Sequence, residues 1–425
     1  MPRRILVLGA GFAGLWSALG AARELDRRGI GPDQVEIVAV NRDAWHSIRV
    51  RNYEASLAGI RVKLAAVFDP VGIRLVQGEV FAIDAAGHRV GIRQDPADQE
   101  SADQGGAETW LQYDRLIFAL GSALARPAVP GLAAHGFDVD TFAGASRLAA
   151  HLARLPSRAA RNGSPTVAVL GAGLTGIETA TEMTQRLEAI GAGRMARVVL
   201  IDRAPLVGSD MGDDARPVIE TALAALGVEA RMGETVVAVD AGEVRLAGGE
   251  VIAAETVVCC AGMRATPLAR LLAVAHDRLG RLRVDETLQV VGIEDVFAAG
   301  DAAWANIDGV HDSAMSCQHS RPMGRFAGHN AVSHLLGQPM LPLRIGYYVT
   351  ILDLGSWGAV YTEGWNRHVV SAGKAAKRTK EMINRQRIYP PTAGGRRALL
   401  EAATPVIQAP PENYGAGEKV VAERA

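Results

Sequence analysis

The chain has 425 residues, enough for two or three domains with large hydrophobic cores. Apolar residues make up 48% of the chain and charged residues 21%, and the net charge of −1 excludes a general nucleic-acid binder. The three cysteines, Cys259, Cys260 and Cys317, form neither a disulfide framework nor a metal-ligand pattern, which favours a reducing cytoplasm and no bound metal. No apolar run approaches the ~20 residues of a membrane-spanning helix.

Short apolar runs alternate with longer helical segments, and this alternation predicts an α/β fold. In the first part of the chain we expect, in order, a strand over 4–8, a helix over 12–28, a strand over 35–40, an irregular polar segment over 45–64, a solvated loop or hairpin tip over 92–110 and a strand over 116–120. In the rest we expect a strand–helix unit from 166 to a strand at 197–201, strands over 256–260 and 296–299, a helix over 317–336, antiparallel strands within 344–371, a basic helix over 372–386 and a mobile tail from about Pro390.

One glycine-rich pattern occurs twice, each time after an apolar strand and at the start of a helix. The first copy is Gly9-Ala10-Gly11-Phe12-Ala13-Gly14, and the second is Gly171-Ala172-Gly173-Leu174-Thr175-Gly176. The glycines let the chain turn tightly and bring backbone N–H groups against a pyrophosphate at the positive end of the helix. Two copies on one chain indicate two dinucleotides side by side, which usually means a flavin facing a nicotinamide.

The residue after the second strand bears on the first glycine turn. This fold usually has an acid there, which accepts hydrogen bonds from the adenosine ribose. Here the position is Asn41, followed by Arg42. An Asn oxygen still accepts from a hydroxyl, but without charge assistance, so the site is weakened rather than removed.

Two later segments favour FAD over a second NAD at the first turn. Residues 114–122, which include Ala119 and Gly121, resemble the strand that covers the adenosine side of the flavin. Residues 295–301 resemble the second flavin motif, which ends in Gly300-Asp301 and whose Asp bonds the ribitol chain. The alternative for Asp301 is an N-cap of the next helix.

At the second glycine turn the acidic position is intact. Asp202 follows the strand at 197–201, where its carboxylate meets a ribose 2′-hydroxyl and repels a 2′-phosphate. NADH is therefore favoured over NADPH, although Arg203 partly offsets the charge. Glu178 is expected on the first turn of the following helix, where it either approaches the nicotinamide and flavin ring edges or complements the helix N-terminus.

The order of these segments predicts an insertion. Because the 300–301 motif completes the first nucleotide site after the second one, the NADH-binding domain is inserted in the FAD-binding domain. We expect two Rossmann-like dinucleotide-binding domains and a C-terminal α+β region, divided as FAD domain 1–140 and 281–340, NADH domain 141–280, and C-terminal antiparallel and helical region 341–425 with a mobile tail.

Through these motifs, residues 4–390 resemble the two-dinucleotide flavoprotein superfamily and, within it, the type II NADH dehydrogenases (NADH:quinone oxidoreductases). The segments that carry the resemblance are 171–178, 261–268 and 297–301. The resemblance implies a bound FAD that takes hydride from NADH and passes electrons onward. It also implies that Gly262 and Gln318 contact a cofactor. For Glu178, it favours the role at the nicotinamide and flavin ring edges over the role at the helix N-terminus.

The chain departs from this family on the acceptor side. The family motif Ala-Gln-x-Ala-x-Gln matches residues 317–322, where Gln318 is kept but Pro322 replaces the second Gln. Arg49 and Arg51 stand in a usually apolar flavin-side segment and suggest a polar or anionic acceptor. The apolar C-terminal anchoring helices of the family are missing.

Other residues near the expected flavin leave alternatives open. Gln318 and His319 are candidate catalytic residues, with His319 either a proton donor and acceptor or a packed histidine. Cys317 has either a redox role or none, whereas Cys259 and Cys260 are expected in the core. The basic segment 374–387 either meets an anionic membrane surface or acidic protein, or is a solvated helix face.

Two function classes follow. The first is an NADH-oxidising flavoenzyme, cytoplasmic or peripheral on the inner face of the membrane, with a quinone, another small molecule or a carrier protein as the acceptor. The second is a redox sensor or binding protein of the apoptosis-inducing-factor type. A homodimer is compatible with either.

Overall fold

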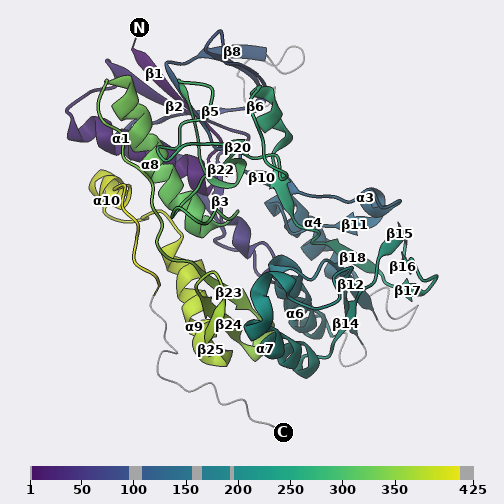
Figure 1. Ribbon diagram of the computed structural model, residues 1–425. Helices are drawn as coiled ribbons and strands as arrows, with labels where there is room; N and C mark the ends of the chain where they lie inside the picture. The colour runs from purple at the N-terminus through teal and green to yellow at the C-terminus, as the bar shows by residue number, and fades with distance from the viewer. Residues whose placement is uncertain (1, 95–107, 156–164, 192–195, 412–425) are drawn as a thin grey trace.

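The computed structural model describes residues 2–94, 108–155, 165–191 and 196–411 (Figure 1). It confirms the predicted α/β class, with two five-stranded sheets of parallel strands and a three-stranded antiparallel sheet near the C-terminus. The two parallel sheets lie in different halves of the molecule, and the C-terminal segment packs beside both (Figure 1).

The first sheet has the order β21-β9-β1-β2-β5. Its strands are β1 (Arg3–Leu8), β2 (Val35–Asn41), β5 (Arg74–Gln77), β9 (Arg115–Phe118) and β21 (Val296–Ala298). The apolar run of β1 is fully buried, as the central position of a parallel strand requires. Because β21 pairs with β9, the chain returns to this sheet after building the second one.

The second sheet has the order β11-β18-β12-β13-β14. Its strands are β11 (Gly136–Phe137), β12 (Thr166–Leu170), β13 (Arg197–Asp202), β14 (Val228–Met232) and β18 (Thr256–Cys259), and its longer helices are α6 (Leu174–Ala189) and α7 (Gly212–Ala225). The two sheets share one register: Leu8 lies opposite Val40 in the first, and Leu170 opposite Ile201 in the second. Asn41 and Asp202, one residue further on, therefore occupy equivalent positions.

Helix α1 (Phe12–Arg27) packs along helix α8 (Cys317–Leu335), although the two are far apart in sequence (Figure 1). Glycines make this contact close. A Cβ at Gly20 would lie 2.7 Å from the carbonyl oxygen of Arg325, and one at Gly328 would overlap the carbonyl oxygen of Ser17. The predicted helix over 317–336 is thus confirmed, and its partner is the first helix of the chain.

Two smaller antiparallel sheets lie beside the main ones. They consist of β6 (Glu79–Asp84), β7 (Arg89–Arg93) and β8 (Glu108–Gln112), and of β15 (Val236–Asp240), β16 (Glu243–Leu246) and β17 (Val251–Ala253). The solvated loop expected over 92–110 is bordered by β7 and β8, and its residues 95–107 lie outside the described part of the chain.

The C-terminal region contains the predicted antiparallel strands and the predicted basic helix. These are β23 (Val349–Asp353), β24 (Ala359–Glu363), β25 (His368–Ala372) and α9 (Gly373–Met382), which continues as a π-helical turn, η9 (Ile383–Arg387). The expectation of a mobile tail from about Pro390 is wrong for α10 (Gly395–Ala402), which buries Leu399 and Leu400 against α1. The pair of leucines supplies an apolar face that the polar composition around it concealed. Residues 412–425 lie outside the described part of the chain.

The remaining short elements connect these units. They are β3 (Trp45–Ser47), β4 (Arg61–Lys63), α2 (Leu64–Phe68), β10 (Ser122–Leu124), α3 (Leu132–His135), α4 (Phe142–Leu152), β19 (Met263–Ala265), β20 (Leu282–Arg283) and β22 (Ala303–Trp304).

The substitution Gly328→Ala tests the contact between α1 and α8. The added Cβ meets the backbone of Ser17, which cannot move without shifting α1, so we expect a loss of about 1–3 kcal/mol of stability. The readout is a lower midpoint of thermal unfolding. Gly346→Ala is the control, because a Cβ there meets nothing within 4 Å. Equal midpoints for both variants would contradict the close packing.

Candidate active site

The first glycine turn joins β1 to α1. Beside its middle glycine, Gly11, lies a space that no protein atom occupies. Gly9 has a φ of +88°, and a Cβ there would lie 2.6 Å from the carbonyl oxygen of Ala119. A Cβ at Gly14 would overlap the carbonyl oxygen of Gly9. These two glycines are required by packing within the chain. Gly11, in contrast, has an ordinary φ of −68° and no protein atom within 4 Å of its Cβ position, as expected where a phosphate approaches the backbone.

Asn41 holds this turn. Its Oδ1 accepts a hydrogen bond from the backbone N–H of Ala10 at 3.0 Å, and its Nδ2 donates to the carbonyl oxygen of Asp43 at 2.8 Å. The sequence predicted a ribose contact for Asn41, and the structure adds this second role. The oxygen keeps one lone pair for a hydroxyl. Arg42 is exposed beside it.

The second glycine turn repeats the first. Gly171 has a φ of +107°, and a Cβ there would lie 2.5 Å from the carbonyl oxygen of Cys260. A Cβ at Gly173 would meet only the side-chain oxygen of Asp210, at 3.2 Å. Asp202 holds this turn as Asn41 holds the first, because its Oδ2 accepts a hydrogen bond from the backbone N–H of Ala172 at 2.5 Å. Thr175 is exposed on the first turn of α6.

Asp301 lies where β9, β21, α1 and α8 meet. Its carboxylate accepts hydrogen bonds from the hydroxyl of Ser122 at 2.7 Å and from the hydroxyl of Ser320 at 3.3 Å. The reading of Asp301 as an N-cap is wrong: Ala299 precedes the 3₁₀ turn over 300–302, and Ser316 caps α8. Gly300 has a φ of +78° and sits against Ala13, which brings the Asp301 backbone beside the first glycine turn.

Glu178 is buried and bonded to the C-terminal region. It lies on the second turn of α6, not on the first as predicted. Its Oε1 accepts from Nζ of Lys380 at 2.6 Å and from the backbone N–H of Asp353 at 3.2 Å. Burial raises the pKa of Glu178, although the positive charge of Lys380 acts to lower it. The reading of Glu178 as a partner of the helix N-terminus is therefore not supported.

The same cluster extends to the first domain. Tyr53 donates a hydrogen bond to Oδ2 of Asp353 at 3.2 Å, and Nζ of Lys377 lies 2.5 Å from Oδ1 of Asp353. Lys377 and Lys380 both belong to the basic segment 374–387. A solvated helix face is thus the wrong interpretation for these two lysines, because α9 turns them inward toward carboxylates.

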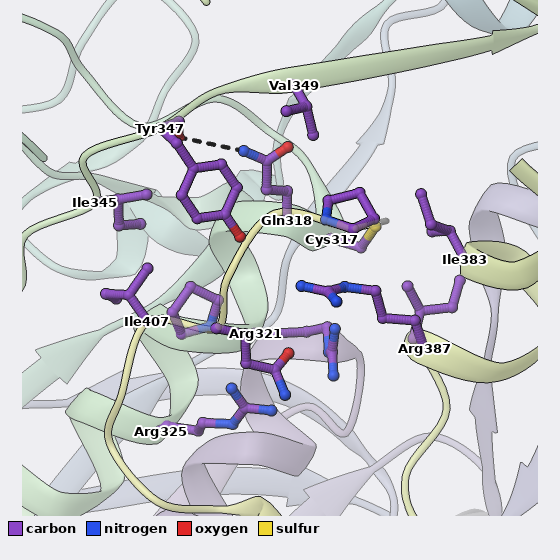
Figure 2. A pocket seen from close by; sticks show the side chains of 14 residues that line it. Cys317, Gln318, Arg321, Arg325, Ile345, Tyr347, Val349, Ile383, Arg387 and Ile407 are labelled. Atoms are coloured by element: carbon purple, nitrogen blue, oxygen red, sulfur yellow. Dashed lines mark hydrogen bonds between the residues drawn. The ribbon is translucent and has the colours of Figure 1, made fainter. Parts of the chain in front are cut away.

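A cavity opens at the N-terminal end of α8 (Figure 2). Gln318 and Cys317 line one side of it, and the Nε2 of Gln318 donates to the carbonyl oxygen of Tyr347 at 3.4 Å. The other lining residues are Arg321, Pro322, Arg325, Ile345, Tyr347, Val349, Ile383, Arg387, Ile388, Ile407, Gln408 and Pro411. Sequence reasoning identified Gln318 and Cys317, and Arg387 as part of the basic segment 374–387, but gave no role to Arg321 or Arg325.

His319 follows Gln318 in the sequence, but it does not line the cavity. Its ring is fully buried beside Tyr348 and Trp365, and its Nδ1 accepts from the backbone N–H of Ala314 at 2.8 Å. Burial lowers the pKa of His319 to about 4. The ring is therefore neutral near pH 7, and its predicted role in proton transfer gains no support from this geometry.

Arg49 and Arg51 suggested an anionic acceptor, and the structure removes that argument. Arg49 is paired with Asp140, and Nη2 of Arg51 lies 2.6 Å from Oε2 of Glu54. Both guanidinium charges are balanced by neighbouring carboxylates. Gly121 and Gly262 have positive φ angles of +67° and +86° where β10 and β19 begin to pair.

A family model for the pyridine nucleotide-disulphide oxidoreductases matches residues 3–324. The chain belongs to this family. A NADH dehydrogenase-like protein of Mycobacterium tuberculosis is 54% identical over 96% of this chain and 100% of its own length. A type II NADH:quinone oxidoreductase of Staphylococcus saprophyticus is 24% identical over 91% of this chain and 95% of its own length.

Among solved structures, NDH2 from Plasmodium falciparum in complex with NADH superposes with a TM-score of 0.73 at 11% identity, over 95% of this chain and 97% of that one. The family and these relatives confirm the predicted resemblance to the type II NADH dehydrogenase branch of the two-dinucleotide flavoproteins. In the ranges that the structure describes, no helix combines the length and apolar character needed to cross a membrane.

The family name refers to disulphide chemistry, yet the cysteines here are free thiols. Cys259 and Cys260 are buried, and burial raises the pKa of Cys260 to about 12. Burial also raises the pKa of Cys317. A thiolate is the reactive form of cysteine, so burial disfavours the reactive form of all three thiols.

The variant Lys380→Met tests the buried ion pair. It leaves the Glu178 carboxylate without its cation, and we expect a loss of about 3–5 kcal/mol of stability. The double variant Glu178→Gln/Lys380→Met removes both charges and should recover most of that loss. Midpoints of thermal unfolding measure the effect, with Lys374→Met, exposed on the same helix, as the control. If Lys374→Met and Lys380→Met unfold alike, the pair does not stabilise the fold.

Proposed function

We propose that this family member oxidises NADH through a bound FAD and passes the electrons to a quinone-class acceptor. The observation that carries the proposal is the repeated glycine turn. A Cβ on the middle glycine would meet nothing within 4 Å at Gly11 and only the side chain of Asp210 at Gly173. Each turn is held by a side chain on the neighbouring strand, Asn41 or Asp202. The NADH dehydrogenase-like relative, similar over the whole of its length, supports the same assignment.

The residues of the first site fit FAD. The backbone N–H groups of 9–14 would bind its diphosphate, Asn41 its adenosine ribose, and Asp301 its ribitol chain, with Ala119 and Gly121 beside the adenosine. When bound, FAD supplies the two-electron chemistry that joins a hydride donor to an acceptor. The open space at Gly11 and the polar side chains that converge on Asp301 are the observations that support this fit.

The residues of the second site fit NADH. The turn over 171–176 would bind the diphosphate, and Asp202 would accept from the ribose 2′-hydroxyl. Its carboxylate repels a 2′-phosphate, so NADH is preferred to NADPH. We keep the division into an FAD domain (1–140 and 281–340), an NADH domain (141–280) and a C-terminal region (341–425) as part of this proposal.

We assign Gln318 to the acceptor side and Glu178 to the nicotinamide and flavin ring edges. Gln318 presents its amide to the cavity and orients the acceptor by hydrogen bonding. Glu178 lies at the junction of the nucleotide helix and the C-terminal sheet, with Lys380 as its cation. We assign His319 a packing role, because its neutral ring is enclosed.

Two alternative functions rank lower. A carrier-protein reductase needs an exposed docking face, whereas Gln318 lines a cavity. A redox sensor of the apoptosis-inducing-factor type needs no acceptor site at all. The name of the Staphylococcus saprophyticus relative, a NADH:quinone oxidoreductase, supports the small-molecule acceptor. We place the protein in the cytoplasm or on the inner face of the membrane.

Paired substitutions in the two glycine turns test the assignment of cofactors. Gly11→Val should fold but lose FAD, whereas Gly173→Val should keep FAD and raise the KM for NADH about tenfold or more, because each side chain enters one diphosphate site only. The readouts are flavin content after gel filtration and steady-state kinetics. Each variant serves as the control for the other. Retention of both cofactors by both variants, or loss of FAD from Gly173→Val, would contradict the assignment.

A further inference from the structure

Three guanidinium groups meet in the cavity at the start of α8 (Figure 2). Arg321 and Arg325 come from α8 and Arg387 from η9. No carboxylate lines the cavity with them, and no ion pair neutralises them within the described residues. The positive charge of this cluster is therefore not balanced by any carboxylate among the residues that the structure describes.

Two of these arginines are also deeply buried. Arg325 is 1% exposed and Arg321 is 6% exposed. The Nε atoms of both, and Nη2 of Arg325, find no hydrogen-bond partner in the described part of the chain. Buried polar groups in proteins almost always have a partner, so an uncompensated pair of this kind points to a ligand.

Arg321 and Arg325 contact the ring of Trp16, but this contact does not replace a counter-ion. Their guanidinium carbons lie over the ring of Trp16, at 5.4 Å for Arg321 and 4.4 Å for Arg325. This contact orients the planar groups but leaves their N–H donors unused. Burial lowers the pKa of Arg321 to about 10 and that of Arg325 to about 9, so both remain charged near pH 7.

The cavity does not include the first glycine turn. None of the residues that line the cavity comes from the glycine turn at 9–14, from 119–122 or from 300–301. Isoleucines and a valine from 345–349, η9 and the segment 407–411 form much of the remaining wall, alongside the polar side chains of Tyr347 and Gln408. Gln318, the acceptor-side residue, lies in the same cavity.

We propose that the acceptor of this enzyme is a quinone-class ring that carries an anionic substituent, held by Arg321, Arg325 and Arg387. The ring lies against the apolar walls and Gln318, and the acidic group lies among the three arginines. A carboxylate or sulfonate matches the planar, forked donors of arginine. This inference rests on the function proposed above and specifies the chemical class of its acceptor.

The reaction stays balanced with such an acceptor. NADH gives up a hydride and becomes NAD⁺, solvent supplies one proton, and the quinone becomes a quinol while its acidic group is unchanged. The cavity volume of about 70 Å³ is small for a ring. Residues 407–411, which Arg387 ties down through the carbonyl oxygen of Ala409, must therefore move aside when the acceptor enters.

The test compares two acceptors of similar size on the yellow holoenzyme: naphthoquinone sulfonate and neutral methylnaphthoquinone. Calorimetry measures the binding of each to the oxidised protein without NADH, and steady-state kinetics give KM and kcat. Arg325→Gln and Arg387→Gln should each weaken naphthoquinone sulfonate about tenfold in Kd and KM and leave methylnaphthoquinone unchanged. Arg385→Gln, exposed two positions from Arg387 and paired with Glu381, is the matched control and should change neither.

The other outcomes separate the possible failures. If NADH does not bleach the flavin of the unmodified protein, the proposed function itself fails. If flavin reduction is normal but the wild type binds both quinones equally, only the anionic acceptor is overturned. Loss of FAD from Arg325→Gln would assign the arginines to the cofactor, and binding of phosphatidylglycerol vesicles that disappears in Arg387→Gln would assign them to a lipid surface. Either result would overturn the proposal. If Arg325→Gln does not fold, Arg387→Gln still tests the proposal, because Arg387 is only half-buried at the cavity wall.

Discussion

The site depends on the close packing of α1 against α8. Gly20, Gly324 and Gly328 let the two helix backbones approach so closely that any larger residue would overlap the opposite backbone. This approach places Ser320 and Asp301 beside the first glycine turn, and Arg321 and Arg325 over Trp16. The nucleotide turn and the acceptor cavity, which lie far apart in sequence, therefore lie at the same end of one helix pair, where both helices begin.

A second constraint is the buried charge cluster around Asp353. Glu178 belongs to the NADH-side helix, Tyr53 to the first domain, and Lys377 and Lys380 to α9. Groups of this kind are costly to bury unless each finds its partner, so the cluster specifies how the C-terminal region sits on the two nucleotide-binding units. The basic helix thus acts as an internal clamp, and the surface role expected for it from composition does not apply to these lysines.

The sequence predicted what depends on local pattern. Glycine spacing, apolar strands and the 317–336 helix follow from chain geometry within a few residues, so both nucleotide turns were recognisable. Pairings between distant residues were not: Lys380 bonds a carboxylate 202 residues away, and nothing in its neighbours indicates an inward orientation. The same limit explains why Arg49 and Arg51 suggested an anionic acceptor although carboxylates balance their charges. Nothing in the local pattern showed that Arg321 and Arg325 have no carboxylate partner in the described part of the chain.

The central claim is that NADH reduces a flavin held by the first glycine turn. Anaerobic stopped-flow mixing of the yellow protein with NADH or NADPH measures this most directly through the loss of flavin absorbance. Rapid bleaching by NADH, slower bleaching by NADPH because of Asp202, and recovery of the colour on addition of a quinone are the predicted results. A flavin that stays oxidised in the presence of NADH would contradict the account.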